Sequence, residues 1–165
     1  MKTLILNRHA KSDWDHPGLH DFERPLNNRG MRDAPYMANI FAERNIKVDM
    51  LYSSTAVRAK TTAEFFINEL NLAPSQVNFT KEIYNSGITF VRETLPLLND
   101  KINSVMYFGH NPDFSSLVKY YSATNVGTLP SCGIAIITFE IDTWNMVDEI
   151  NGTLEVFDFP KNYEI

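Results

Sequence analysis

Short apolar runs alternate along the chain with longer stretches in which apolar residues recur at helical spacing. Runs of this length, rich in β-branched and aromatic residues, are typical of buried strands. The alternation predicts an α/β fold, a single three-layer domain with a mostly parallel sheet and helices on both faces. The runs that predict strands are Thr3–Leu6, Val48–Tyr52, Ser104–Phe108, Gly133–Phe139 and Leu154–Phe159.

Two helices are predicted before the middle of the chain. The first lies within Gly30–Arg44, where Pro35 belongs to the first turn or marks a kink. The second follows Ser53 or Ser54, since either side chain can cap a helix whose apolar residues fall on one side. This arrangement puts Arg58 near the first turn of that helix.

Two more helices are predicted in the second half. Thr89–Leu98 has the pattern of a short helix that Pro96 should end or bend. In the segment "NPDFSSLVKYY" we expect Asn111 to act as the cap and Pro112 to occupy the first helical position. His110 then sits between a strand and the start of a helix.

Composition narrows the function classes. With 165 residues, 44% of them hydrophobic, residues 1–165 are expected to form one domain with a real core. The formal charge of −5 argues against a nucleic-acid or anionic-membrane surface, although a small anionic ligand fits. The single cysteine, Cys132, is assigned to packing. The first apolar run is too short for a signal peptide, so we expect a cytoplasmic protein.

Arginine and histidine side chains follow three of the predicted strands. Arg8 and His9 leave the first strand, Arg58 follows the second, and His110 follows the third. Each is weak evidence alone, because a single histidine is more often structural than catalytic. Since loops at the carboxyl ends of parallel strands lie along one edge of a sheet, we expect the four residues to converge.

Such a group of residues suits phosphoryl transfer. Two guanidinium groups offer planar pairs of donors to phosphoryl oxygens and stay charged at working pH. A neutral histidine between them can attack phosphorus and form a phosphohistidine intermediate. We therefore interpret Arg8, Arg58 and His110 as an anion site around His9, the candidate nucleophile.

Four segments resemble a known family in their order and spacing: "NRHAKSDW", "DFERPLNNRG", "YSSTAVRAKTTAEFF" and "FGHNPDFSSL". They resemble the histidine phosphatase superfamily, which includes phosphoglycerate mutases, and in particular its SixA-type phosphohistidine phosphatases. Ala10 stands where many members have glycine. The resemblance implies a phosphoglycerate mutase-like fold, a catalytic role for His9, Arg8, Arg58 and His110, and no metal or other cofactor.

Further polar residues near these motifs are candidates for the rim of the site. Arg24, Ser12 and Asn111 are predicted to contact substrate, with Lys11 as a further rim residue. The alternative for Arg24 is a structural role in fixing the conformation of its loop. For Arg29 we favour this structural role. Asp21 is interpreted as a carboxylate that orients an arginine. His16 and His20 belong either to a mobile polar loop or to a metal site, and we favour the mobile loop.

Glu82 is the candidate general acid, although its segment "EIYNSG" is closer to the SixA-type pattern, where that acid is generally not assigned. An alkoxide leaving group benefits from such an acid, whereas an imidazole does not need one. The main hypothesis is therefore hydrolysis of phosphohistidine on a protein such as a histidine-phosphotransfer domain. The alternatives are a phosphatase or mutase acting on small phosphorylated metabolites, with Glu82 as acid, and a non-catalytic phosphohistidine-binding module.

Overall fold

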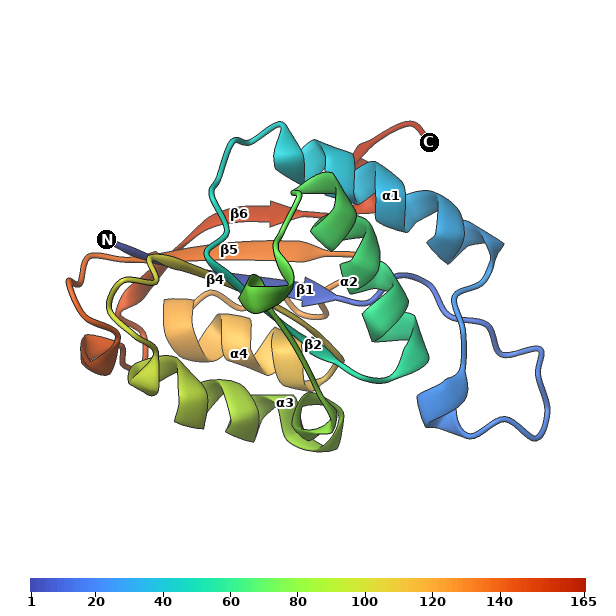
Figure 1. Cartoon of the computed structure of the whole chain (residues 1–165), viewed down its shortest axis with the longest axis horizontal. Helices are drawn as coiled ribbons and strands as arrows, with labels where there is room; N and C mark the ends of the chain where they lie inside the picture. Colours follow the sequence, from blue (N-terminus) through green and yellow to red (C-terminus); the bar gives the residue numbers. More distant parts are fainter.

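Six strands form one sheet in this computed structural model, which describes residues 1–165 (Figure 1). The strands lie in the order β3-β2-β4-β1-β5-β6. Only β5 runs against the others, because it pairs antiparallel with both β1 and β6. The predicted mostly parallel α/β fold is therefore confirmed. The strands are β1 Lys2–Arg8, β2 Met50–Ser54, β3 Val77–Thr80, β4 Ser104–Gly109, β5 Ile134–Phe139 and β6 Gly152–Asp158.

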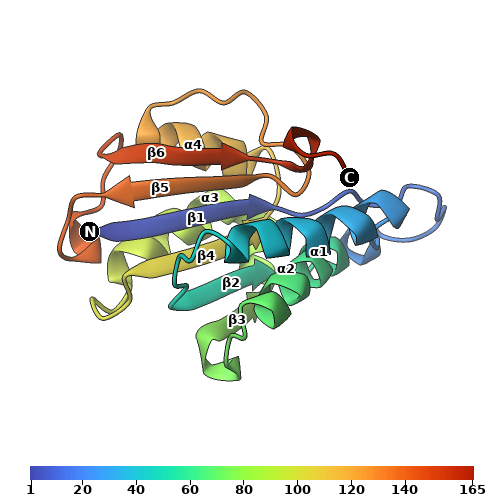
Figure 2. The same cartoon turned by 90° about the horizontal axis from the view of Figure 1, so that it is seen from above.

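Two pairs of helices cover the sheet, one pair on each face (Figure 2). Successive side chains of a strand point to opposite faces, so each inner strand contributes to two cores. In β1, Leu4 and Leu6 join the core under α3 and α4, whereas Ile5 joins the core under α1 and α2. No helix has the length and apolar character needed to cross a membrane. The helices are α1 Asn28–Ala42, α2 Val57–Glu69, α3 Lys81–Thr94 and α4 Asp113–Ser122.

The prediction for the third helix placed its start too late, and β3 was not predicted at all. α3 begins at Lys81, not at Thr89, and Ser86 has non-helical backbone angles inside it. That interruption, followed by Gly87, breaks the periodic pattern that would have revealed the first turns. β3 has only four residues at the edge of the sheet, and none of them is fully buried, which leaves no apolar run to detect.

Two predicted helix caps are wrong. Ser53 and Ser54 belong to β2, and Ala56 precedes the first residue of α2. The Oγ of Ser54 instead accepts a hydrogen bond from the Ala56 N–H at 3.1 Å. Pro112, not Asn111, caps α4 and therefore lies just outside the first helical position. Both errors come from reading cap residues one to three positions away from the true helix start.

The first helix starts two residues before the predicted segment. Asn27 caps α1, and its side chain accepts a hydrogen bond from the Gly30 N–H at 2.9 Å. Pro35 consequently lies inside the helix and beyond its first turn. Cys132 is buried in the core between the sheet, α1 and α2, as its predicted packing role requires.

Candidate active site

The ends of β1 and β4 lie side by side, and each is followed by a histidine. The two strands pair in parallel with Arg8 opposite Gly109. The His9 N–H donates a hydrogen bond to the Gly109 carbonyl at 3.1 Å. The rings of His9 and His110 consequently lie with their centroids 5.2 Å apart.

Gly109 permits the close approach of α4 behind this strand end. A Cβ atom at this position would lie 2.4 Å from ring atoms of Phe114, the second residue of α4. Phe114 is fully buried, so its ring has little room to move. The glycine therefore sets how closely the helix lies behind His110.

Hydrogen bonds determine which ring nitrogen of His9 carries the proton. Nδ1 lies 2.7 Å from the carbonyl oxygen of Ala10. A carbonyl oxygen only accepts, so Nδ1 is protonated and Nε2 keeps its lone pair. Nε2 faces the Nε–H of Arg58 at 3.3 Å. Burial, with the charges of His110, Arg58 and Arg8, lowers the pKa of His9 well below 6.5, which leaves the ring neutral at pH 7.

Arg58 is buried in the first turn of α2 and is held by the loop that follows β1. Its Nη1 donates to the Asp21 carbonyl at 2.6 Å, and its Nη2 donates to Oδ2 of Asp21 at 2.9 Å. One turn later, the Thr62 hydroxyl accepts from the Ala10 N–H at 3.0 Å and donates to the Arg58 carbonyl at 2.7 Å. These bonds fix α2 against the residue that follows the candidate nucleophile.

His110 shares a hydrogen bond between its Nε2 and the Oγ of Ser54 at 2.8 Å. Ser54 is the last residue of β2, the strand beside β4. Burial, reinforced by the charge of Arg58, lowers the pKa of His110 to about 4. Both histidines are therefore neutral at pH 7 in the free protein.

Two polar groups in the site are buried without a hydrogen-bond partner. They are Nε of Arg8 and Nδ1 of His110. Arg8 is otherwise anchored by its Nη1, which donates to the Leu129 carbonyl at 3.0 Å. Unpartnered buried polar groups are rare in folded proteins, and two of the five in this chain occur on residues predicted to surround a phosphoryl group.

Asp21 connects the two arginines of the rim. Its Oδ1 accepts from Nε and Nη2 of Arg24, at 3.0 and 2.9 Å, and its Oδ2 accepts from Arg58 and from the Tyr84 hydroxyl at 3.0 Å. Burial raises the pKa of Asp21, but the three donors outweigh it and hold the pKa at about 2. Arg24 also donates to Oγ of Ser12 at 2.6 Å, so Asp21 and Ser12 both position this arginine.

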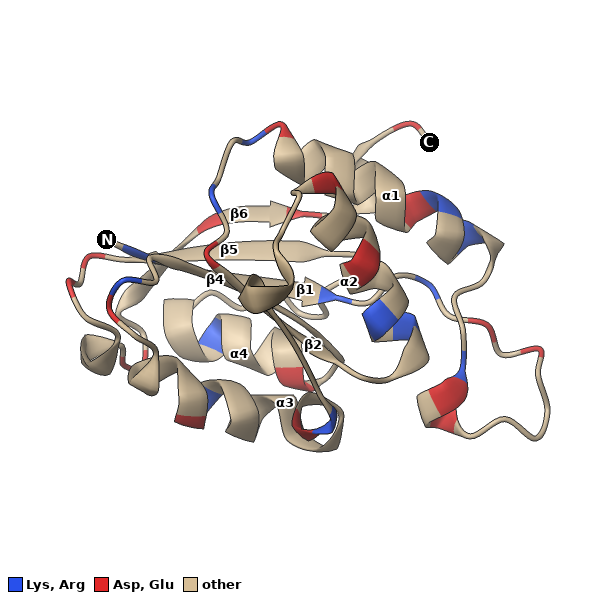
Figure 3. Ribbon diagram, in the orientation of Figure 1, with Lys and Arg blue, Asp and Glu red and all other residues tan.

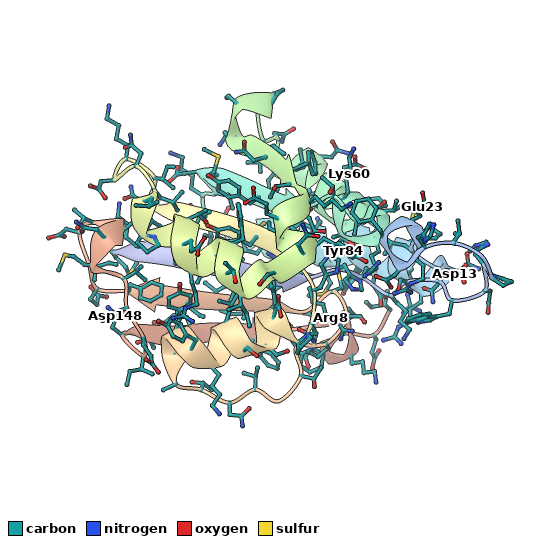
Figure 4. The ribbon with its side chains drawn as sticks, turned by 90° about the horizontal axis from the view of Figure 1, so that it is seen from below. Arg8, Asp13, Glu23, Lys60, Tyr84 and Asp148 are labelled. Atoms are coloured by element: carbon teal, nitrogen blue, oxygen red, sulfur yellow. The ribbon has the colours of Figure 1, made fainter.

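Both histidines and the three arginines described above line a cavity of about 400 Å³. Figure 3 shows basic ribbon segments at the end of β1 and the start of α2, facing the loop that follows β1. Figure 4 shows Arg8 and Tyr84 at the end of the molecule from which this loop projects, with Asp148 at the opposite end. The lining residues are Arg8, His9, Lys11, Ser12, Trp14, Asp21, Arg24, Arg58, His110, Asn111 and Ser131.

The structure brings all but one of the residues predicted for the site to this cavity. Asn111 lines it, but its amide is already used: Nδ2 donates to Leu129 and Oδ1 accepts from Ser115. Glu82 is exposed in the first turn of α3 and does not line the cavity. Arg29, for which we favoured a structural role, also lies outside it and pairs with Asp33.

No group of three or more His, Cys, Asp or Glu side chains is arranged to hold a metal ion. His16 and His20 are both exposed, and Nε2 of His16 lies 3.1 Å from Oδ2 of Asp13. Four cations line the cavity and outnumber its single carboxylate, Asp21; they are Arg8, Lys11, Arg24 and Arg58. The cavity thus suits a small anion.

Sequence reasoning missed four residues that complete the site. Ser54 was read as a helix cap, although it bonds His110. Thr62, Trp14 and Tyr84 were given no role in the site. Nothing in the local pattern marks these residues. Ser54, Thr62 and Tyr84 each bond a partner more than fifty positions away, and Trp14 meets Arg24 within a loop that has no periodic pattern.

A family comparison agrees with this geometry. The model of the histidine phosphatase superfamily (branch 1) matches residues 4–87, which include Arg8, His9 and Arg58. The chain therefore belongs to the histidine phosphatase superfamily. His110 lies beyond the matched residues and joins the site through the pairing of β4 with β1.

Solved structures and a curated relative extend over most of the chain. The putative phosphohistidine phosphatase SixA of Agrobacterium tumefaciens superposes with a TM-score of 0.79 at 26% identity, covering 96% of this chain and 98% of that one. A protein histidine phosphatase SixA complexed with tungstate has the same fold, with a TM-score of 0.79 at 24% identity and coverage of 97% and 98%. An uncharacterized protein of Mycobacterium tuberculosis is 29% identical over 141 residues, 79% of this chain and 85% of the relative.

Proposed function

We propose that this protein is a phosphohistidine phosphatase that acts on a phosphorylated protein through a transient phosphohistidine at His9. The tautomer of His9 carries the proposal. The Ala10 carbonyl holds the proton on Nδ1, which leaves the lone pair of Nε2 in a cavity lined by Arg8, Arg24 and Arg58. Attack on a phosphoryl group needs a neutral nucleophile and nearby guanidinium groups that bind the phosphoryl oxygens.

The reaction has two displacements at phosphorus. In the first, the lone pair of Nε2 forms the N–P bond while the bond from phosphorus to the leaving nitrogen breaks and that nitrogen keeps the electron pair. The proton that this imidazole needs comes from solvent or is already on its ring. In the second, a water oxygen attacks phosphorus, the bond to Nε2 breaks, and the water proton leaves with the phosphate or to solvent. Arg8 and Arg58 stabilise the charge on the equatorial oxygens in both steps.

The absence of a protonated carboxyl group from the cavity lining favours phosphohistidine over a phosphomonoester. Asp21 is the only carboxyl group that lines the cavity, and with a pKa of about 2 it is ionised at neutral pH. Glu82 is exposed outside the cavity. In this cavity an alkoxide leaving group would receive no proton from a carboxylic acid and would leave slowly, whereas an imidazole is already a good leaving group.

We further propose that residues 1–165 act as one domain and that the reaction needs no metal ion. In support of one domain, β1 lies in the sheet between β4 and β5, so segments far apart in sequence share one core. Turnover that is unchanged by EDTA supports metal independence, and turnover lost with EDTA and restored by a divalent cation contradicts it.

The test compares turnover of a phosphohistidine-bearing histidine-phosphotransfer domain with turnover of a panel of small phosphomonoesters, with the His9→Ala protein as blank. Selective dephosphorylation of the protein supports the proposal. A clear preference for phosphomonoesters, lost in Glu82→Gln, supports the phosphatase or mutase alternative instead. Tight phosphate binding with no turnover of any substrate supports a binding module.

A further inference from the structure

Trp14 is a large aromatic residue left open to solvent at the cavity that holds His9. It is 71% exposed, yet it lines this cavity together with His9 and Arg58. The other tryptophan, Trp144, is fully buried. Tryptophan is highly buried on average, because burying its large apolar surface is favourable, so a tryptophan this exposed is unusual. A ligand that covers Trp14 would therefore gain binding free energy.

The indole of Trp14 packs against the guanidinium group of Arg24. The guanidinium carbon of Arg24 lies 3.5 Å from the centroid of the indole ring, a close cation–π contact. Arg24 is itself only 8% exposed and is fixed by Ser12 and Asp21. One face of the indole is covered by this arginine. The high exposure of the residue leaves the opposite face free.

A second depression of about 380 Å³ adjoins the cavity on the side of Trp14. Lys11, Ser12 and Trp14 line both hollows. Because His9 and Trp14 line the same cavity, a group bound with its phosphorus at His9 can extend toward Trp14, and the rest of its carrier can lie over the second depression. The other residues of the second depression are Asp13, Asp15, Asn27, Asn28 and Arg29.

We infer that the free face of Trp14 stacks against a planar aromatic ring that carries the phosphoryl group. Aromatic rings stack favourably, whereas an alkyl group offers less contact to a flat surface. Trp14 is thus a specificity-determining residue that favours imidazole-borne or phenol-borne phosphoryl groups over alkyl ones. The inference rests on the proposed function only in taking the cavity at His9 as the phosphoryl site.

The test measures binding of phenylphosphonate, methylphosphonate and inorganic phosphate, none of which is hydrolysed, by isothermal titration calorimetry. The variants are Trp14→Leu, Trp14→Phe and the control Leu19→Ala, an exposed apolar residue of the same loop that lines neither hollow. In Trp14→Leu, we expect phenylphosphonate to bind about 3- to 10-fold more weakly, as stacking free energies imply. Methylphosphonate and phosphate should change less than about twofold, and Trp14→Phe should retain most of the preference for the phenyl group.

Other outcomes overturn the inference. Equal weakening of phenylphosphonate and methylphosphonate in Trp14→Leu would mean that Trp14 acts by positioning Arg24. Unchanged binding of both would mean that the ring of the ligand does not reach Trp14. If no phosphonate binds the wild-type protein, the assignment of the cavity as an anion site is wrong as well. Because the phosphonates do not react, a wrong assignment of the reaction leaves the stacking comparison intact.

Discussion

His9 and His110 leave adjacent strands that are joined by backbone hydrogen bonds, whereas the rim loop, residues 13–24, meets the rest of the site through side chains. The rim loop projects from the end of the sheet in Figure 1. Its contacts with the site come mainly from Asp21 and Arg24, which bond Arg58, Tyr84 and Ser12. The strand ends therefore set where phosphorus can sit, and the rim loop sets how the arginines and Trp14 surround it.

The largest effect is expected at the strand ends. Replacement of His9 by Ala removes the nucleophile, so turnover should fall by at least about 10⁴-fold and no labelled phosphoenzyme should be trapped. The matched control is His16→Ala, an exposed histidine that does not line the cavity. Turnover close to wild type in the His9 variant would exclude covalent catalysis by this residue.

A smaller effect is expected in the rim loop. Asp21→Asn keeps the shape of the side chain but loses the charge that holds Arg24 and Arg58, so kcat should fall about tenfold through misplaced donors. KM should fall or stay unchanged, since removal of a negative charge favours binding of an anion. Glu23→Gln, an exposed acid beside it that does not line the cavity, serves as the control. A rise in KM with kcat unchanged would show that Asp21 acts in binding.

The pH dependence of kcat/KM should reflect the burial of the histidines at the strand ends. For a histidine with a pKa of ~6.5, the neutral fraction would fall about eightfold between pH 7 and 5.5. Because burial lowers the pKa of His9 well below 6.5, the fall in kcat/KM that comes from His9 should be clearly smaller than eightfold. An eightfold fall that is the same with every substrate would mean that His9 is solvated.

The same burial has a consequence for stability. Between the lowered pKa of His9 in the folded protein and 6.5 in the unfolded chain, the unfolded state binds more protons, so the free energy of unfolding decreases as pH falls. Urea midpoints at pH 7 and 5 should show this loss, and it should be smaller in His9→Ala. An equal loss in both proteins would assign the pH dependence to other groups.

The smallest effect is expected at Glu82. Since its side chain is exposed and does not line the cavity, Glu82→Gln should change turnover of a phosphohistidine protein by less than about twofold. Glu93→Gln, in an exposed later turn of the same helix, is a matched control. A loss of tenfold or more in Glu82→Gln alone would make this carboxyl group part of the mechanism.

The contrast between strand ends and rim loop also explains what the sequence could predict. Arg8, His9 and His110 follow apolar runs, and the rules of parallel sheets bring such positions to one edge. Their convergence could therefore be predicted from the amino-acid pattern alone. Ser54 could not be assigned correctly, because a serine near a helix start looks like a cap whether or not a histidine of the next strand reaches it.

The rim loop was much harder to predict. Asp21 was expected to orient an arginine, but its bonds to two arginines and to Tyr84 depend on the path of a loop without periodic pattern. The first turns of α3, which carry Tyr84, were not predicted because Ser86 interrupts the helix. Long-range side-chain contacts thus account for most of what was missed.

The position of β1 between β4 and β5 bears on how the protein is made. β1 is made before the other strands of this sheet, yet it pairs with residues about a hundred positions later, as Leu4 does with Val105, and then with β5. The segment before β5 also closes the site, since Cys132 N–H donates to the His9 carbonyl at 3.0 Å. Such distant pairings form late during synthesis. A nascent chain that ends before β5 should therefore carry the nucleophile without activity, so that phosphatase activity begins only after β5 has been made.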